Sequence, residues 1–175
     1  MLNYFERYQP DVVLAYNDLA KEAEAFGCHV KYSDYVVPSI DQHVLHEDKD
    51  PISAVTGSVR DALRLGCAAV GYTIYPGSAH CKVMYEQLRA IAEDAKDAGL
   101  AVVVWSYPRG SDIDGKGGPN SFYAIDYAAR MAMEMGADIV KLNMPKVGLD
   151  TDKDAPAPYN EMEVSADEAI RQCVE

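Results

Sequence analysis

Long apolar runs are missing from this sequence of 175 residues. No stretch approaches the roughly 18 consecutive apolar residues that a membrane-spanning helix needs, and residues 1–7 lack the layout of a signal peptide. Positive charge is also scarce: 16 Lys and Arg stand against 28 Asp and Glu, which gives a net charge of −12. We therefore expect a cytoplasmic chain that binds neither nucleic acid nor an anionic membrane surface as a whole.

Motifs for metals and nucleotides are missing as well. The four cysteines show no CxxC spacing, so we interpret them as reduced, partly buried thiols. His43 and His46 stand near two acidic residues, but no further His or Cys follows at a useful spacing, so no metal site is expected. No GxGxxG follows a predicted strand, and the glycine-rich run 115–118 lacks the P-loop spacing. The sequence thus predicts no cofactor.

One type of junction occurs four times: a helical pattern ends in glycine, and a short apolar strand follows. Their glycines are Gly27, Gly66, Gly99 and Gly136, which stand 33 to 39 residues apart. Glycine tolerates the left-handed conformation that closes a helix, and this spacing is close to the ~30 residues of one βα unit. With 49% hydrophobic and 25% charged residues, the chain is ordinary in composition. We expect one domain over residues 1–175.

The predicted elements alternate between strand and helix. Strands are expected at 12–15, 28–32, 68–75, 101–106 and 139–142. Helices are expected from 17 or 18 to 26 and at 58–65, 79–98 and 121–135, and a capping box of Ser165 and Glu168 opens a last helix. The segments 36–56, 112–120 and 145–162 are expected to be irregular. This alternation predicts an α/β fold with a parallel sheet and right-handed crossovers.

The carboxyl ends of the predicted strands carry a group of polar and aromatic side chains. In parallel α/β folds the ligand site lies at this edge. The residues that fall there are Lys31, Tyr75, Trp105, Tyr107 and Lys141. Core packing does not require such residues at these positions, so their convergence favours a binding or catalytic site.

Lys141 is the main candidate for catalysis because it follows the apolar residues of a strand that should be buried. Burial costs an ammonium several kcal/mol unless it is paired and lowers the pKa of a lysine towards neutrality, which makes the amine a nucleophile. Such an amine forms an iminium with a carbonyl, and the iminium lets an adjacent C–C bond break. The alternative is that Lys141 reaches out of the strand end into solvent.

The chemistry of an iminium also needs a group that moves protons. Tyr107 could supply it as a phenol, and Trp105, two residues earlier on the same side of the strand, could wall the pocket. Both residues could instead serve only in packing. Lys31 could be a second cation that depresses the pKa of Lys141 or holds a phosphate, or it could be a surface lysine.

Three segments, 71–78, 104–110 and 136–141, resemble the archaeal-type class I fructose-bisphosphate aldolases, in sequence and in order. The resemblance runs from about Asp11 to the end of the chain. It implies a (β/α)8 TIM barrel, a Schiff-base lysine at Lys141, a catalytic tyrosine at Tyr107 and a neighbouring tryptophan at Trp105. Lys31 resembles the lysine at the end of the family's third strand. The resemblance also implies a phosphorylated sugar substrate, a homo-oligomer and a role in glycolysis and gluconeogenesis. It implies no metal.

The chain departs from that family in extent. Its five predicted strands correspond to strands two to six of the barrel, and a whole barrel takes about 250 residues. Unpaired sheet edges at 12–15 and 139–142 would invite association. We therefore expect an incomplete barrel with little aldolase activity as an isolated chain. The alternatives are a related Schiff-base lyase or transferase acting on another sugar phosphate, and a non-catalytic βα fragment that needs a partner.

Overall fold

The computed structural model describes residues 41–43 and 49–174 of the chain. All of them belong to one compact unit, Val37–Glu175. The strands predicted at 12–15 and 28–32, the helix between them and Lys31 lie outside the described residues. Those assignments, and the expectation of one domain over residues 1–175, therefore stay predictions.

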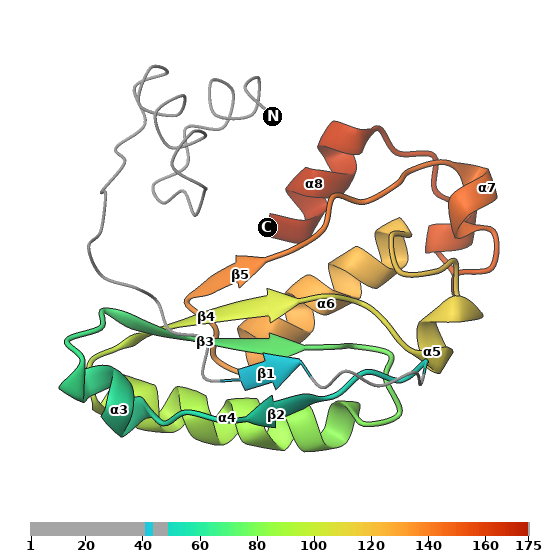
Figure 1. Cartoon of the computed structure of the whole chain (residues 1–175). Helices are drawn as coiled ribbons and strands as arrows, with labels where there is room; N and C mark the ends of the chain where they lie inside the picture. The colour runs from blue at the N-terminus through green and yellow to red at the C-terminus, as the bar shows by residue number, and fades with distance from the viewer. Residues whose placement is uncertain (1–40, 44–48, 175) are drawn as a thin grey trace, which may run out of the picture. The chain divides into compact units, whose positions relative to one another are not determined.

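A three-stranded parallel sheet forms the centre of the described residues (Figure 1). Its strands are β3 (Ala69–Ile74), β4 (Ala101–Ser106) and β5 (Ile139–Lys141), in the order β3-β4-β5. They confirm three of the predicted strands to within one or two residues. The β3 and β4 strands read as near-continuous runs of apolar residues, which is typical of parallel strands covered on both faces.

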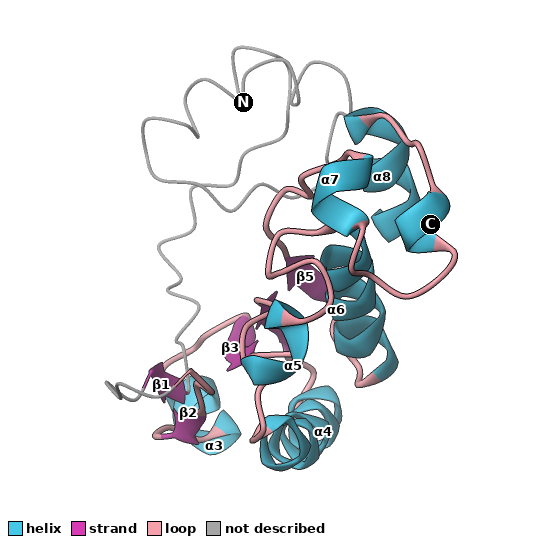
Figure 2. Cartoon of the chain, turned by 90° about the vertical axis from the view of Figure 1, so that its right-hand side faces the viewer, coloured by secondary structure: helices cyan, strands magenta, loops and turns pink. Residues whose placement is uncertain are grey.

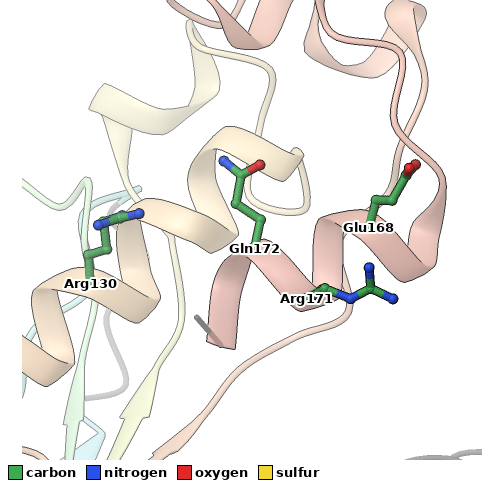
Figure 3. A pocket seen from close by; sticks show the side chains of 4 residues that line it. All are labelled: Arg130, Glu168, Arg171 and Gln172. Atoms are coloured by element: carbon green, nitrogen blue, oxygen red, sulfur yellow. The ribbon is translucent and has the colours of Figure 1, made fainter.

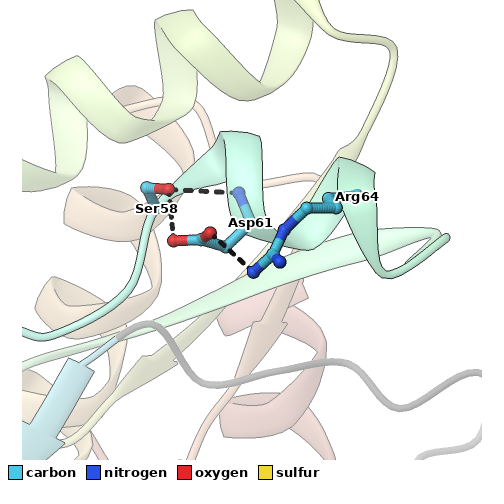
Figure 4. Close-up of polar contacts among 3 residues, drawn as sticks. All are labelled: Ser58, Asp61 and Arg64. Atoms are coloured by element: carbon cyan, nitrogen blue, oxygen red, sulfur yellow. Dashed lines mark hydrogen bonds and ion pairs between the residues drawn. The ribbon is translucent and has the colours of Figure 1, made fainter.

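Three helices precede or connect these strands, as the sequence predicted. They are α3 (Val59–Arg64), α4 (Cys81–Asp97) and α6 (Phe122–Glu134). At the start of α3 the hydroxyl of Ser58 accepts a hydrogen bond from the backbone N–H of Asp61, whose carboxylate in turn holds Arg64 (Figure 4). The hydroxyl of Ser121 caps α6 in the same way, through the N–H of Ala124. These serines satisfy helix donors that would otherwise lack a partner.

The three predicted glycine junctions that lie within the described residues, at Gly66, Gly99 and Gly136, are Schellman motifs. After α4, the N–H of Gly99 donates to the carbonyl of Lys96, and the N–H of Leu100 donates to the carbonyl of Ala95. Gly99 has a φ of 74°, which a residue with a side chain rarely adopts. The same pair of hydrogen bonds closes α3 and α6, at Gly66 and Gly136. The repeated glycine therefore turns each helix directly into the next strand.

The main core lies between the sheet and the helices. Figures 1 and 2 show α4 and α6 running along one side of the strands. The side chains on that side of β3 and β4 are buried: Val70, Tyr72, Ile74, Val102 and Val104. They pack against the apolar stripe of α4, namely Met84, Leu88, Ile91, Ala92 and Ala95. The opposite side of the sheet is left to the predicted site residues.

Three segments that were predicted to be irregular contain regular structure. Strands β1 (Asp41–His43) and β2 (Ser53–Val55) pair antiparallel within 36–56. A one-turn helix, α5 (Ser111–Asp114), lies at the start of 112–120, and α7 (Leu149–Asp152) and a 3-10 turn (Tyr159–Glu161) lie within 145–162. These elements have three or four residues each, which is too short for a periodic pattern to indicate them.

The last helix, α8 (Ala166–Val174), begins with the predicted capping box. The hydroxyl of Ser165 accepts from the N–H of Glu168, and the Glu168 carboxylate accepts from the N–H of Ser165. The preceding segment is fixed to α6 by Tyr159, whose hydroxyl donates to the buried carboxylate of Asp126 at 2.5 Å. Among the described residues, no helix is long and apolar enough to cross a membrane.

Asp152 of α7 allows a prediction about pH. Its carboxylate is buried and accepts a hydrogen bond from the N–H of Tyr123, and burial raises its pKa above 3.8. Because the pKa of Asp152 is higher in the folded than in the unfolded state, its titration adds to the free energy of unfolding below pH 3.8. This stabilisation is lost as the pH rises through the folded-state pKa. Asp152→Asn should therefore be more stable than the wild type at pH 7, and the difference should vanish towards pH 3.8. Urea unfolding at both pH values measures this, and an equal difference at both would contradict it.

Candidate active site

Parallel register brings two predicted site residues, Trp105 and Lys141, into one row with Thr73 of β3. Thr73 pairs with Trp105, and Trp105 pairs with Lys141. Residues in register on neighbouring strands point to the same face of a sheet, and side chains two positions further along a strand join them. Tyr75 and Tyr107 follow two positions after Thr73 and Trp105, beyond the ends of β3 and β4. Trp105 and Lys141 therefore lie on the side of the sheet opposite to α4 and α6, whereas Tyr75 and Tyr107, beyond the strand ends, also pack against the main core.

Lys141 and Tyr107 are in direct contact. The Lys141 Nζ donates a hydrogen bond to the Tyr107 hydroxyl at 2.5 Å and lies 4.8 Å from the centre of the Tyr107 ring. The two residues come from neighbouring strands, since β4 pairs with β5 and Trp105, two positions before Tyr107, is in register with Lys141. The pairing of a lysine amine with a phenol, expected from sequence, is thus present in the geometry.

The expected burial of Lys141 is not found. Its side chain is exposed, and Ile139 and Val140 before it are only half-buried. The physical reason is the position of β5, which has β4 as its one strand neighbour among the described residues. A strand at the edge of a sheet lacks the cover that a central strand receives. The amine is therefore not buried in the described part of the chain, although it does contact the phenol, and the catalytic roles of both residues stay predictions.

The indole of Trp105 packs against Gly71 of β3. A side chain at Gly71 would collide with atoms Cζ3 and Cη2 of the indole, so the absence of a side chain there gives the ring its place. The indole consequently covers the sheet beside the Lys141 row, where Val103 is buried. This position fits the predicted role of a wall, although no feature of the sequence indicates that Gly71 makes room for it.

Gly71→Ala should displace the indole. Overpacking of this kind costs about 1–3 kcal/mol, and the emission of Trp105 should shift to longer wavelength as the ring moves towards water. Trp105 is the one tryptophan of the sequence, so the fluorescence is assigned without ambiguity. Gly115→Ala is the matched control, since a side chain there meets nothing within 4 Å and the φ of −85° suits alanine. Equal spectra and equal stability of the two variants would contradict this packing.

Arg109 joins the site without having been predicted. Its guanidinium carbon lies 6.0 Å from the ring centre of Tyr75 and 5.8 Å from that of Tyr107. Tyr75 is buried, so it provides a fixed surface for this contact. The Tyr107 ring thus has the Lys141 amine and the Arg109 guanidinium as neighbours. The sequence signal was present, because Arg109 follows Tyr107 by two positions and so belongs to the same face.

Other parts of the chain add no predicted residue to this group. Lys31 lies outside the described residues, and its part in the site stays a prediction. Among residues 41–43 and 49–174, no group of three or more His, Cys, Asp or Glu could hold a metal ion. A hollow of about 390 Å³ between α6 and α8 is lined by Arg130, Glu168, Arg171 and Gln172 (Figure 3). None of these four is a predicted site residue, so the hollow is distinct from the predicted site.

The fold and this cluster together define a class: α/β proteins with a parallel sheet that carry a lysine and a phenol at the carboxyl ends of adjacent strands. A comparison with family models narrows the class. The model described as DeoC/LacD family aldolase matches residues 8–169. The chain belongs to this family.

Individual relatives of this chain are also named as aldolases. The class 1 fructose-bisphosphate aldolase of Thermoproteus tenax is 42% identical over 119 residues, which are 66% of this chain and 44% of that protein. A crystal structure of an archaeal fructose 1,6-bisphosphate aldolase matches 86% of this chain and 55% of its own, with 32% identity and a TM-score of 0.60. The chain therefore has an α/β fold that corresponds to part of a TIM barrel, and it spans about half or less of the length of these relatives.

A further solved structure bears on the chemistry of the relatives. It is described as an archaeal fructose-1,6-bisphosphate aldolase whose catalytic Lys is covalently bound to the carbinolamine intermediate of the substrate. This chain is similar to it over 81% of its own residues and 52% of that chain, with 32% identity and a TM-score of 0.58. At least one aldolase that this chain resembles therefore has a catalytic lysine that bonds covalently to its substrate.

Proposed function

We propose that this chain is the catalytic region of a class I aldolase, which cleaves fructose 1,6-bisphosphate reversibly into dihydroxyacetone phosphate and glyceraldehyde 3-phosphate. The observation that carries the proposal is the 2.5 Å contact between the Lys141 amine and the Tyr107 hydroxyl. It is supported by membership of the aldolase family and by relatives that are named class 1 fructose-bisphosphate aldolases.

The proposed reaction uses Lys141 as the nucleophile. The unprotonated amine attacks the ketose carbonyl at C2, and loss of water from the carbinolamine gives an iminium. A base then removes the proton of the C4 hydroxyl, the C3–C4 bond breaks, and its electron pair moves into the iminium to give an enamine. Glyceraldehyde 3-phosphate leaves at this stage. Protonation of the enamine at C3 and addition of water then release dihydroxyacetone phosphate and regenerate the amine.

The proton transfers fall to Tyr107 in this proposal. Its hydroxyl lies within hydrogen-bond distance of the nitrogen that reacts, which is the geometric requirement for a general acid or base. Trp105 walls the site on one side, as its packing on Gly71 supports. Tyr75 is the predicted substrate contact and Lys31 the predicted second cation. Arg109 adds a guanidinium, the side chain best suited to bind a phosphate.

The open edge of β5 supports a second proposal, which concerns association. Among the described residues β5 pairs with β4 alone, so its other side presents unpaired backbone donors and acceptors. We propose that this edge pairs with further barrel strands or with another polypeptide before turnover is efficient. We further propose that the protein forms a homo-oligomer. We also propose that it is cytoplasmic and acts in glycolysis and gluconeogenesis.

Chemical trapping tests the proposed function. The chain is incubated with dihydroxyacetone phosphate and sodium borohydride, which reduces an iminium to a stable amine, and peptides are then mapped by mass spectrometry. Labelling at Lys141 is expected. No label on any lysine would refute the Schiff-base mechanism, and co-purification as an oligomer without a label would favour the association proposal alone.

A further inference from the structure

Asp50, from the acidic segment that precedes β2, joins two loops at the carboxyl end of the sheet. Its Oδ1 accepts hydrogen bonds from the N–H of Ala79 at 2.9 Å and from the N–H of Ser111 at 2.9 Å. It also accepts from the Ser111 hydroxyl at 3.1 Å. Ala79 lies between β3 and α4, and Ser111 lies after β4, so a single carboxylate oxygen connects the segments that follow both strands.

Further contacts make these segments one unit. The Ser78 hydroxyl donates to the carbonyl of Pro51 at 2.7 Å and accepts from the N–H of His80 at 3.1 Å. A side chain at Gly110 would collide with the backbone of Gly77 and Ser78, so the two loops touch. Figure 1 shows the chain before β2 passing close to α5, in agreement with these bonds.

The loops that Asp50 connects lead directly to Tyr107 and Arg109. The N–H of Tyr107 donates to Ile74, and the N–H of Arg109 donates to Pro76 at 3.0 Å, so residues 107–109 run along residues 74–76. Ser111 follows Arg109 by two positions and is held by Asp50. A shift of the segment after β4 would therefore move the Arg109 guanidinium and the Tyr107 ring relative to Lys141.

We propose that Asp50 is a positioning residue of the active site: by accepting from Ala79 and Ser111 it fixes the loops that aim Tyr107 and Arg109 at Lys141. The ionised form suits this role, because the N–H of Ser111 and then that of Ala79 lower the pKa of the Asp50 carboxyl. The inference rests on the proposed function for its catalytic consequence, whereas the loop contacts themselves do not depend on it.

The test compares three variants. Asp50→Ala removes the acceptor, and Asp50→Asn keeps a side-chain oxygen that can accept the same hydrogen bonds. Asp61→Ala is the matched control, because Asp61 is also an aspartate whose pKa is lowered by hydrogen bonds, but it is exposed and lies in the cap of α3 (Figure 4). Each variant is assayed for the rate of borohydride-trapped adduct at saturating dihydroxyacetone phosphate. Hydrogen exchange is measured for peptides that cover 74–80 and 107–113.

Asp50→Ala should lower the trapping rate about tenfold, since small displacements of positioned groups cost up to about 10²-fold. It should also speed exchange in both peptides. Asp50→Asn should recover most of the rate, and Asp61→Ala should lower the melting temperature with an unchanged rate. Wild-type exchange and trapping in Asp50→Ala, or an Asp50→Asn variant as slow as Asp50→Ala, would overturn the inference. An unlabelled wild type would refute the proposed function instead, and the exchange of the two peptides then decides the role of Asp50.

Discussion

Replacement of Lys141 by arginine is expected to abolish the covalent adduct with dihydroxyacetone phosphate. Arginine keeps the positive charge and much of the length, but its guanidinium stays protonated and does not attack a carbonyl. Where the nucleophile of an active site is removed, the loss is on the order of 10⁶-fold, so no adduct should be detected. Stability should change little, because the Lys141 side chain is exposed. Intact-protein mass spectrometry after borohydride treatment measures the adduct, and urea unfolding measures the stability.

Lys82→Arg is the control for this experiment. Lys82 lies on the exposed side of α4, 3.9 Å from Glu86, in a surface pair that contributes little to stability. Its substitution should leave the adduct unchanged in amount and position. A label that persists in Lys141→Arg, on Lys146 or any other lysine, would show that the reactive amine had been assigned to the wrong residue.

The sequence predicted the parts of the fold that repeat. The glycines after α3, α4 and α6 mark junctions that the backbone forms with the same two hydrogen bonds each time. The apolar runs of β3 and β4 and the capping serines are local features, and they were predicted to within one or two residues. Such features depend on residues within a turn or a strand of one another, which is why a single sequence contains them.

Parts that depend on distant residues were not predictable in this way. The exposure of Lys141 follows from which strands flank β5, and nothing near Lys141 in the sequence reports that. The bond from Ser111 to Asp50 spans 61 residues, and an aspartate in an acidic segment is more often solvated than used. Gly71 opens the segment 71–78 that resembles the aldolases, but its close approach to Trp105 requires the register of β3 and β4.

The contact between Lys141 and Tyr107 combines both kinds of information. The two residues were selected because each stands at a predicted strand end, and the rule that ligand sites lie at the carboxyl ends of parallel strands brought them together. The register of β4 and β5 then places Lys141 opposite Trp105, two positions before Tyr107, and a long lysine side chain covers the remaining distance. The topology rule was therefore sufficient for the pair, while the degree of burial required the structure.

Tyr107→Phe separates nucleophilic attack from proton transfer. Phenylalanine keeps the ring on which the amine and the guanidinium lie, but it lacks the hydroxyl that accepts from Lys141. Loss of a general acid or base typically costs about 10²–10⁴-fold. Exchange of a C3 hydrogen of dihydroxyacetone phosphate with deuterated water, followed by NMR, requires the iminium and one proton transfer without cleavage of a bisphosphate. We expect this exchange to fall by that factor, while borohydride still traps an adduct on Lys141, although more slowly than in the wild type because dehydration of the carbinolamine also needs a proton transfer.

Tyr123→Phe provides the comparison, since Tyr123 lies on α6 and its ring packs 5.3 Å from that of Tyr159, among aromatic neighbours on that helix. Its hydroxyl has no part in the proposed reaction, so exchange at C3 should match that of the wild type. Folding of Tyr107→Phe should be preserved, because the exposed ammonium of Lys141 can donate to water in place of the phenol. If the Tyr107→Phe chain exchanges the C3 hydrogen as fast as the wild type, then the phenol only orients the amine. The proton must in that case be carried by another group at the ends of the strands.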